Sequence, residues 1–196
     1  AMVDGVVPMD RAQIENARMS AAALSAIVRQ LGELTGAEAA ALQRRSERLD
    51  LAPLASEIVA AMDRLLRDRS VTAQVDGAAQ AWADRGHVER ALRNVVTNAV
   101  QHSPAGGAVV IALTQAASGM AQIRVSDAGP GIPARDVPHV FERFYRADPA
   151  RASGSAGSGI GLTIARELLA ANGGSIGVER TGPDGTVFVI HLRSGA

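Results

Sequence analysis

The chain has 196 residues, a formal net charge of zero, and a composition that is 47% hydrophobic and 3% aromatic. This length suits one well-buried domain plus an accessory element, and the neutral charge gives no general attraction to nucleic acid or to a membrane surface. The absence of Cys excludes disulfides and thiolate metal sites, and the absence of Lys means that any cationic contact to phosphate must come from Arg.

The first 50 residues carry a predicted helical segment. Apolar residues at helical spacing run from Ile14 to Leu34, and Asp10 is the candidate N-cap. Such a stripe needs an apolar surface, which is either the rest of its own domain or a helix of a partner or second subunit. Residues 37–49 either extend this helix or form a second short one. No run of this chain reaches the roughly 20 apolar residues of a membrane span, and no signal peptide is visible.

From about residue 51 onward, helical and strand-like patterns alternate, with Asp50 and Pro53 at the boundary. Helices are predicted over 54–67, 87–102 and 162–171. Strands are predicted over 70–75, 79–83, 109–114, 120–126, 175–179 and 186–192. This order predicts an α/β two-layer sandwich, with a mixed sheet and helices on one of its faces.

The helix predicted over 87–102 carries a row of amide side chains. Asn94, Asn98 and Gln101 follow one another beside its apolar stripe. Asn is a mediocre helix former, so these residues are either satisfied surface amides or amide oxygens that face a hydrated Mg²⁺.

Two glycine-rich turns bracket the segment that follows the strand at 120–126. Asp127 ends that strand and precedes Gly129 and Gly131, so its carboxylate can accept a hydrogen bond from a ligand that approaches the backbone closely. The second turn holds Gly157, Gly159 and Gly161, and its helix start offers free N–H groups to phosphate. Each turn is a weak signal by itself.

Arg143 and Arg146 lie between the two turns, among aromatic residues. They either form a solvated face or neutralise charge on a terminal phosphate.

Four motifs in this order resemble the catalytic, ATP-binding domain of bacterial sensor histidine kinases, within the wider family of gyrase, heat-shock protein 90 and mismatch-repair ATPases. RALRNVVTNAV at 90–100 resembles the N box, and VSDAGPGI at 125–132 resembles the G1 box. VFERFYR at 140–146 resembles the F box, which separates sensor kinases from the other members, and GSGIGL at 157–162 resembles the G2 box. The resemblance covers residues 51–196 and implies a mostly antiparallel five-stranded sheet with about three helices.

The resemblance implies a role for each matching residue. Asn98 is expected to bind Mg²⁺, with Asn94 close to the phosphates of ATP. Asp127 is expected to bind the adenine amine in a pocket shaped by Gly129, Gly131 and Thr186. Residues 132–160 are expected to form the ATP lid, which carries Arg143 and Arg146 as catalytic residues. Its hinge and phosphate cradle are expected at Gly157, Gly159, Gly161 and Leu162.

The sequence departs from the family pattern at two places. Gln101 stands where many members carry Lys or Arg, and His102 stands where many carry Tyr. The acceptor-histidine motif of the dimerisation hairpin is also missing, since His87, His102, His139 and His191 all lack its context. Residues 1–50 resemble the second helix of that hairpin, so the acceptor lies either upstream of this sequence or on another polypeptide.

The expected function is therefore that of a protein-histidine kinase: the chain binds Mg-ATP and transfers the γ-phosphate to a histidine on a separate dimerisation helix. The expected partners are that helix and, indirectly, a response regulator, without nucleic acid and without membrane contact by this chain. The expected location is cytoplasmic, with any membrane anchor upstream. Two alternatives are a nucleotide-binding regulatory module without kinase activity and a serine kinase of the anti-sigma type, which the F box disfavours.

Overall fold

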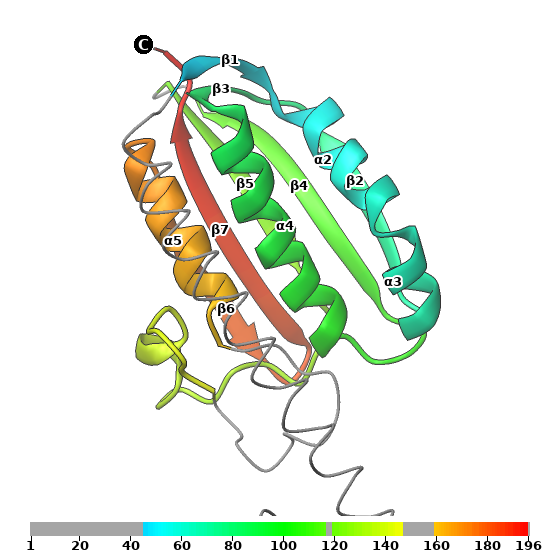
Figure 1. Cartoon of the computed structure of the whole chain (residues 1–196). Coiled ribbons are helices and arrows are strands. Elements are labelled where there is room, and N and C mark those ends of the chain that lie inside the picture. The colour runs from blue at the N-terminus through cyan, green and yellow to red at the C-terminus, as the bar shows by residue number, and fades with distance from the viewer. Residues whose placement is uncertain (1–44, 117–118, 147–158, 196) are drawn as a thin grey trace, which may run out of the picture.

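A five-stranded sheet forms one layer of the computed structural model, which describes residues 45–116, 119–146 and 159–195. Its strand order is β2-β4-β5-β7-β6, and the strands run over Thr72–Gly77, Ala108–Ala116, Met120–Ser126, Gly185–Arg193 and Ser175–Gly182 respectively (Figure 1). β2 pairs with β4 in parallel, and the other three pairs are antiparallel. The predicted mixed, mostly antiparallel sheet is confirmed.

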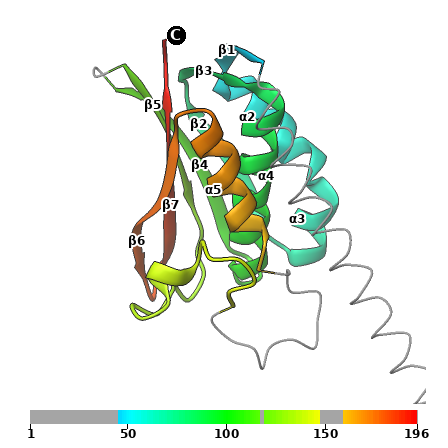
Figure 2. The same ribbon diagram turned by 60° about the vertical axis from the view of Figure 1, so that its left-hand side comes forward.

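Among the described residues, four α-helices cover one face of this sheet, and Figure 2 shows the sheet nearly edge-on with the helices beside it. They are α2 (Leu51–Ala61), α3 (Asp63–Arg69), α4 (Arg85–His102) and α5 (Gly161–Ala171). A 3-10 turn, η1, spans Val137–His139. The predicted two-layer α/β sandwich is therefore confirmed for the described part of the chain.

Alternation along the strands explains why only one face is covered. In β5 the side chains of Ala121, Ile123 and Val125 are buried, while their neighbours are only partly so. In β7, Phe188 and Ile190 point into the same core. Because successive strand residues point to opposite faces, this period of two places the apolar set beneath α4 and α5.

Two predicted boundaries in the first part of the domain are wrong. The helix predicted over 54–67 is divided at Met62, which is buried and whose N–H bonds to the carbonyl of Val59 at 3.0 Å. Residues 46–49 were included in a predicted helix, but Ser46–Asp50 forms strand β1. Pairing with a partner strand overrides the local helical pattern there.

Strand β1 pairs antiparallel with β3 (Gln80–Asp84) in a separate two-stranded sheet. The two strands predicted over 70–75 and 79–83 therefore enter different sheets. The helix predicted over 10–34 lies outside the described residues, and the division of the chain at residue 50 stays a prediction. None of the described helices combines the length and apolar character that a membrane span requires.

Helices α4 and α5 run antiparallel and are joined at one end by buried polar groups. The side-chain nitrogen of Asn172 donates to the carbonyl of Leu168 at 2.7 Å and lies 3.1 Å from Nδ1 of His87. Its Oδ1 accepts from the N–H of Asp84 at 2.8 Å. Because Asp84 caps α4 through the N–H of His87, this network fixes the start of α4 against the end of α5.

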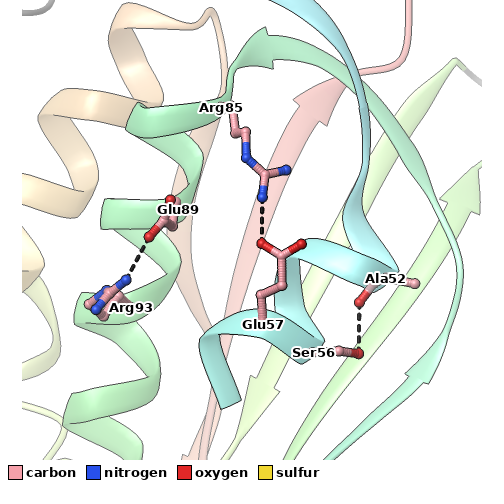
Figure 3. Close-up of polar contacts among 6 residues, drawn as sticks. All are labelled: Ala52, Ser56, Glu57, Arg85, Glu89 and Arg93. Carbon is pink, nitrogen blue, oxygen red and sulfur yellow. Dashed lines mark hydrogen bonds and ion pairs between the residues drawn. The ribbon is translucent and has the colours of Figure 1, made fainter. Parts of the chain in front are cut away.

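Ion pairs on the outer side of the helices are solvent-exposed (Figure 3). Arg85 of α4 contacts Glu57 of α2, and Arg93 contacts Glu89 one turn earlier. Exposed pairs of this kind contribute about 0–1 kcal/mol.

We expect Asn172→Ala to lower the free energy of unfolding by about 1–3 kcal/mol, because it leaves the partly buried N–H of Asp84 and the carbonyl of Leu168 without their side-chain partner. Glu57→Ala serves as the control and should cost at most about 1 kcal/mol. Urea denaturation followed by circular dichroism measures both. Equal costs for the two variants would contradict the role assigned to the network.

Candidate functional site

The carboxylate of Asp127 lies where the end of β5 meets the start of β7. Its Oδ1 accepts hydrogen bonds from the N–H of Gly129 at 2.8 Å and of Thr186 at 3.1 Å. The N–H of Asp127 donates to the carbonyl of Thr186 at 2.9 Å. None of these bonds uses Oδ2, so this oxygen is the one that can accept a hydrogen bond from a ligand.

Burial raises the pKa of Asp127 above its ordinary value. The N–H groups of Gly129 and Thr186 and the charge of His102 oppose this shift without cancelling it. The residue as a whole is 9% exposed. A desolvated carboxylate gains from a further hydrogen-bond donor, since a donor stabilises its charged form.

Two glycines after Asp127 bring the backbone segments of this site into contact. Gly131 has φ +78°, and a Cβ there would lie 2.2 Å from the carbonyl oxygen of Gly182. At Gly129 a Cβ would lie 2.8 Å from the carbonyl oxygen of His102. The turn after β5 thus packs between the β6–β7 hairpin and the end of α4, and only glycine permits that approach.

Two threonine hydroxyls contact each other beside the turn after β5. Thr186 is buried, and its Oγ1 lies 3.2 Å from Oγ1 of Thr181. Thr181 Oγ1 also accepts from the N–H of Ile132 at 2.6 Å. Sequence reasoning missed Thr181, because the only signal for it is the cross-strand pairing of residues 181 and 186 around a short turn.

Asn94 lies on α4 beside the start of α5. A Cβ at Gly161 would be 3.8 Å from the Asn94 side chain. The Asn94 Nδ2 atom is buried and has no hydrogen-bond partner among the described residues. Since buried polar atoms are nearly always paired, this donor points to an acceptor that a ligand supplies. Asn98, one turn further along α4, is half-buried.

The segment between the two glycine-rich turns has an internal bond at Tyr145 and contacts the rest of the domain at Phe141. The hydroxyl of Tyr145 donates to Oδ1 of the buried Asp136 at 2.8 Å, and this bond raises the pKa of Tyr145. Thr163 of α5 donates to the carbonyl of Phe141 at 3.1 Å, and the Phe141 ring contacts Phe188 edge-on. No sequence pattern indicated the Tyr145–Asp136 bond.

The F-box turn presents an aromatic side chain to solvent. Phe144 is 56% exposed and has φ +65°, and its N–H donates to the carbonyl of Gly159 at 3.1 Å. Arg143 lies 3.7 Å from a carboxylate oxygen of Glu167 on α5. Arg146 is half-buried at the end of the described segment.

The structure brings most of the predicted site residues to one end of the sheet. Asp127, Gly129, Gly131 and Thr186 meet around one carboxylate, and Asn94 meets Gly161 at the start of α5. Leu162 packs against the core beside them. Gly157 lies outside the described residues, as does residue range 147–158 of the predicted lid. Within the described part of the chain there is no cluster of three or more His, Cys, Asp and Glu side chains that could hold a metal.

The donor set fits a nucleotide. The Asp127 carboxylate oxygen that accepts no backbone N–H suits an exocyclic amine, and the unpaired amide N–H of Asn94 suits a phosphate oxygen. The carbonyl oxygens of Asn94 and Asn98 belong to the class of hard ligand that Mg²⁺ prefers.

Comparisons with known proteins identify the family of this chain. Residues 83–196 match the model of the family described as histidine kinase-, DNA gyrase B-, and HSP90-like ATPase. The sensor protein IrlS of Burkholderia pseudomallei (strain K96243) is 40% identical over 131 residues, which cover 67% of this chain and 28% of IrlS. The signal transduction histidine-protein kinase/phosphatase MprB of Mycobacterium sp. (strain KMS) is 38% identical over 173 residues, which cover 86% of this chain and 33% of MprB. The chain thus spans about a third of the length of these curated relatives.

Solved structures show the same fold. That of the mycobacterial sensor histidine kinase MprB superposes with a TM-score of 0.65 at 33% identity, covering 75% of this chain and 97% of that one. Full-length ShkA in complex with AMPPNP gives a TM-score of 0.75 at 23% identity, covering 97% of this chain and 41% of that one. The chain therefore belongs to the family of histidine kinase-, DNA gyrase B- and HSP90-like ATPases, and it carries the catalytic, ATP-binding domain of a two-component sensor histidine kinase.

Proposed function

We propose that this chain binds Mg-ATP and transfers the γ-phosphate to a histidine on a separate dimerisation helix. The observation that carries the proposal is the pairing of two sites at one end of the sheet. The buried Asp127 carboxylate retains a free oxygen, and Asn94 retains an unpaired N–H at the start of α5.

Asp127 accepts a hydrogen bond from the adenine amine in this proposal, and Gly129, Gly131 and Thr186 enclose the ring. Asn94 donates to a phosphate oxygen, while the start of α5 at Gly161 offers further N–H groups to the phosphates. Asn98 supplies an amide oxygen to Mg²⁺, which neutralises phosphate charge when bound.

Phosphoryl transfer depends mostly on positioning and charge stabilisation, so the chain needs no covalent intermediate of its own. Arg143 and Arg146 belong to the lid that residues 132–160 form in this proposal, and Gly157 and Gly159 belong to its hinge. The guanidinium groups of Arg143 and Arg146 stabilise the transferring phosphoryl group when the lid closes. The acceptor histidine, and the acidic residue that assists its deprotonation, come from the dimerisation helix rather than from this chain.

We expect the chain to label a histidine hairpin in trans. The full chain, γ-labelled ATP and Mg²⁺ would be mixed with the purified dimerisation hairpin of a related sensor kinase. Phosphate that is acid-labile and base-stable should appear on the hairpin and not on the chain alone. A hairpin whose acceptor His is replaced by Ala is the control and should stay unlabelled.

Other outcomes of this experiment separate the alternatives. ATP binding without any transfer would favour a regulatory module. An acid-stable, base-labile phosphate on a protein substrate would indicate a serine kinase. Label on any of the chain's own four His residues would contradict the proposed route.

We expect Asp127→Asn to weaken ATP binding by more than about tenfold, because a charge-assisted hydrogen bond contributes about 1.5–3 kcal/mol. The variant should be as stable as the parent chain or more stable at neutral pH. Burial raises the folded-state pKa of Asp127, so its ionised form costs stability once the pH exceeds the unfolded value, and Asn removes that cost.

Calorimetric titration with ATP and thermal melting measure these two effects. Asp76→Asn, at an exposed carboxylate of β2, is the matched control and should leave ATP affinity unchanged. Retained affinity in Asp127→Asn would refute the adenine assignment.

We expect Asn98→Ala to remove the dependence of ATP affinity on Mg²⁺. Removal of Mg²⁺ by a chelator should weaken ATP binding to the parent chain, whereas Asn98→Ala should bind ATP about equally weakly with and without the ion. A lost metal partner costs on the order of 10-fold or more in metal affinity. Asn94→Ala is the comparison: its ATP affinity should fall, but the response to Mg²⁺ should persist. Full Mg²⁺ dependence in Asn98→Ala would rule out the ligand role.

A further inference from the structure

The carboxylate of Asp136 is buried but only half paired. The residue is 5% exposed, and its Oδ1 accepts a hydrogen bond from the Tyr145 hydroxyl at 2.8 Å. Its Oδ2 has no hydrogen-bond partner among the described residues. Arg135 lies 3.5 Å from Oδ1, but the Arg135 side chain is 83% exposed, so water screens this pair. Because burying a carboxylate without full pairing disfavours folding, its presence here indicates a role other than stability.

Asp136 and Tyr145 stand at the two ends of a run of backbone turns. The N–H of His139 donates to the carbonyl of Asp136 at 3.0 Å, and the N–H of Glu142 donates to that of His139 at 2.8 Å. The N–H of Tyr145 then donates to the carbonyl of Glu142 at 3.3 Å. The bond from the Tyr145 hydroxyl to Asp136 closes this run into a ring. The side-chain bond therefore fixes the last turn of the run relative to the first.

The last turn of the run contacts the second glycine-rich turn. The N–H of Phe144 donates to the carbonyl of Gly159 at 3.1 Å, and a Cβ at Gly159 would lie 2.6 Å from the Tyr145 carbonyl oxygen. Phe144 has φ +65°, a left-handed conformation that an aromatic residue keeps only where its surroundings hold it. The contact with Gly159 thus depends on a backbone that the neighbouring Tyr145 fixes in place.

Other contacts of this segment act on an earlier part of it. Thr163 donates to the carbonyl of Phe141, and Arg143 lies 3.7 Å from a carboxylate oxygen of Glu167. Both contacts precede Phe144 in the sequence. Loss of the Asp136–Tyr145 bond should therefore loosen the contact with the second glycine-rich turn while the rest of the segment stays docked.

We propose that Asp136 and Tyr145 form a positioning pair that holds the start of α5 in place for the phosphates of the nucleotide. This inference rests on the proposed function, because it takes Asn94 and the start of α5 as the phosphate end of the site. Gly161 begins α5 two residues after Gly159, and a Cβ at Gly161 would lie 3.8 Å from the Asn94 side chain. The pair acts through this backbone and needs no contact of its own with the ligand.

The test compares ATP with adenosine, which keeps the base and the sugar but lacks the phosphates. Dissociation constants of both, with Mg²⁺, would be measured on the full chain by calorimetry for ATP and by NMR titration for adenosine. The parent chain should bind ATP more tightly, and the ratio of the two affinities measures what the phosphate end contributes.

Tyr145→Phe removes the hydroxyl but keeps the ring, whose centroid lies 5.4 Å from that of the His139 ring. The ratio should fall about 10-fold in this variant, as expected when one hydrogen bond to a charged group is lost. The affinity for adenosine should stay at the parent value, because Asp127 and its neighbours are unchanged.

Three further variants separate positioning from general damage to the fold. Asp136→Asn keeps an acceptor oxygen for the Tyr145 hydroxyl and should hold the ratio within about 3-fold of the parent, since a neutral bond replaces a charge-assisted one. Asp136→Ala should lower the ratio as much as Tyr145→Phe does, and the double variant should lower it no further. Arg135→Ala removes the exposed guanidinium beside the same carboxylate and is the control, with the ratio of the parent chain.

Amide hydrogen exchange of the chain without nucleotide gives a second readout. The Phe144 N–H should exchange faster in Tyr145→Phe than in the parent chain, because its bond to Gly159 is no longer held. The N–H of Ile123, in the core of β5, should exchange at the parent rate in both.

An unchanged ratio in a folded Tyr145→Phe would overturn the proposal, and so would an equal loss of ATP and adenosine affinity, which would show a structural role only. A parent chain that binds ATP no more tightly than adenosine would instead overturn the proposed function. The exchange of the Phe144 N–H would then decide the role of the pair by itself, and an unchanged rate in Tyr145→Phe would refute it.

Discussion

The junction between Asp127 and Thr186 is the constraint on which the rest of the site depends. At this junction the N–H of Thr186 donates to the Asp127 side chain, and the carbonyl of Thr186 accepts from the N–H of Asp127. The end of β5 and the start of β7 are therefore joined by the Asp127 side chain as well as by the backbone hydrogen bonds of the sheet. The turn after β5 must then leave between the β6–β7 hairpin and α4, where the close approach of Gly131 to Gly182 admits no side chain.

This arrangement has an energetic cost that the fold only partly offsets. Burial disfavours the Asp127 charge, and two N–H groups compensate for some of that loss. A further donor to the carboxylate would stabilise its charged form, as the two N–H groups do. Asn94 is the complementary case, because its buried side-chain N–H is a donor that lacks an acceptor. In the proposed function, the Asp127 oxygen that accepts no backbone N–H takes the base amine, and the unpaired Asn94 N–H takes a phosphate oxygen.

Local pattern predicted the elements that alternation and spacing determine, and it missed those that depend on partners. The alternation of β5 and the apolar stripe of α4 were sufficient to place both elements within two residues. Ser46–Asp50 has no strand pattern, and it is a strand because β3 pairs with it. Asp127, Gly129 and Gly131 were found because they are neighbours in sequence. Thr181 and the Tyr145–Asp136 bond were not, because their partners lie on other elements or follow no local motif.

The F-box turn shows how the fold holds a strained conformation. A left-handed backbone at an aromatic residue costs on the order of 1–3 kcal/mol, and Phe144 adopts it at φ +65°. Three bonds surround this position: the Phe144 N–H to Gly159, the Tyr145 hydroxyl to Asp136, and the Thr163 hydroxyl to Phe141. Gly159 itself has φ +74° and passes so close to the Tyr145 carbonyl that a Cβ would lie 2.6 Å from it. Contacts within the domain therefore hold the two ends of the chain segment that connects Arg146 to α5 side by side.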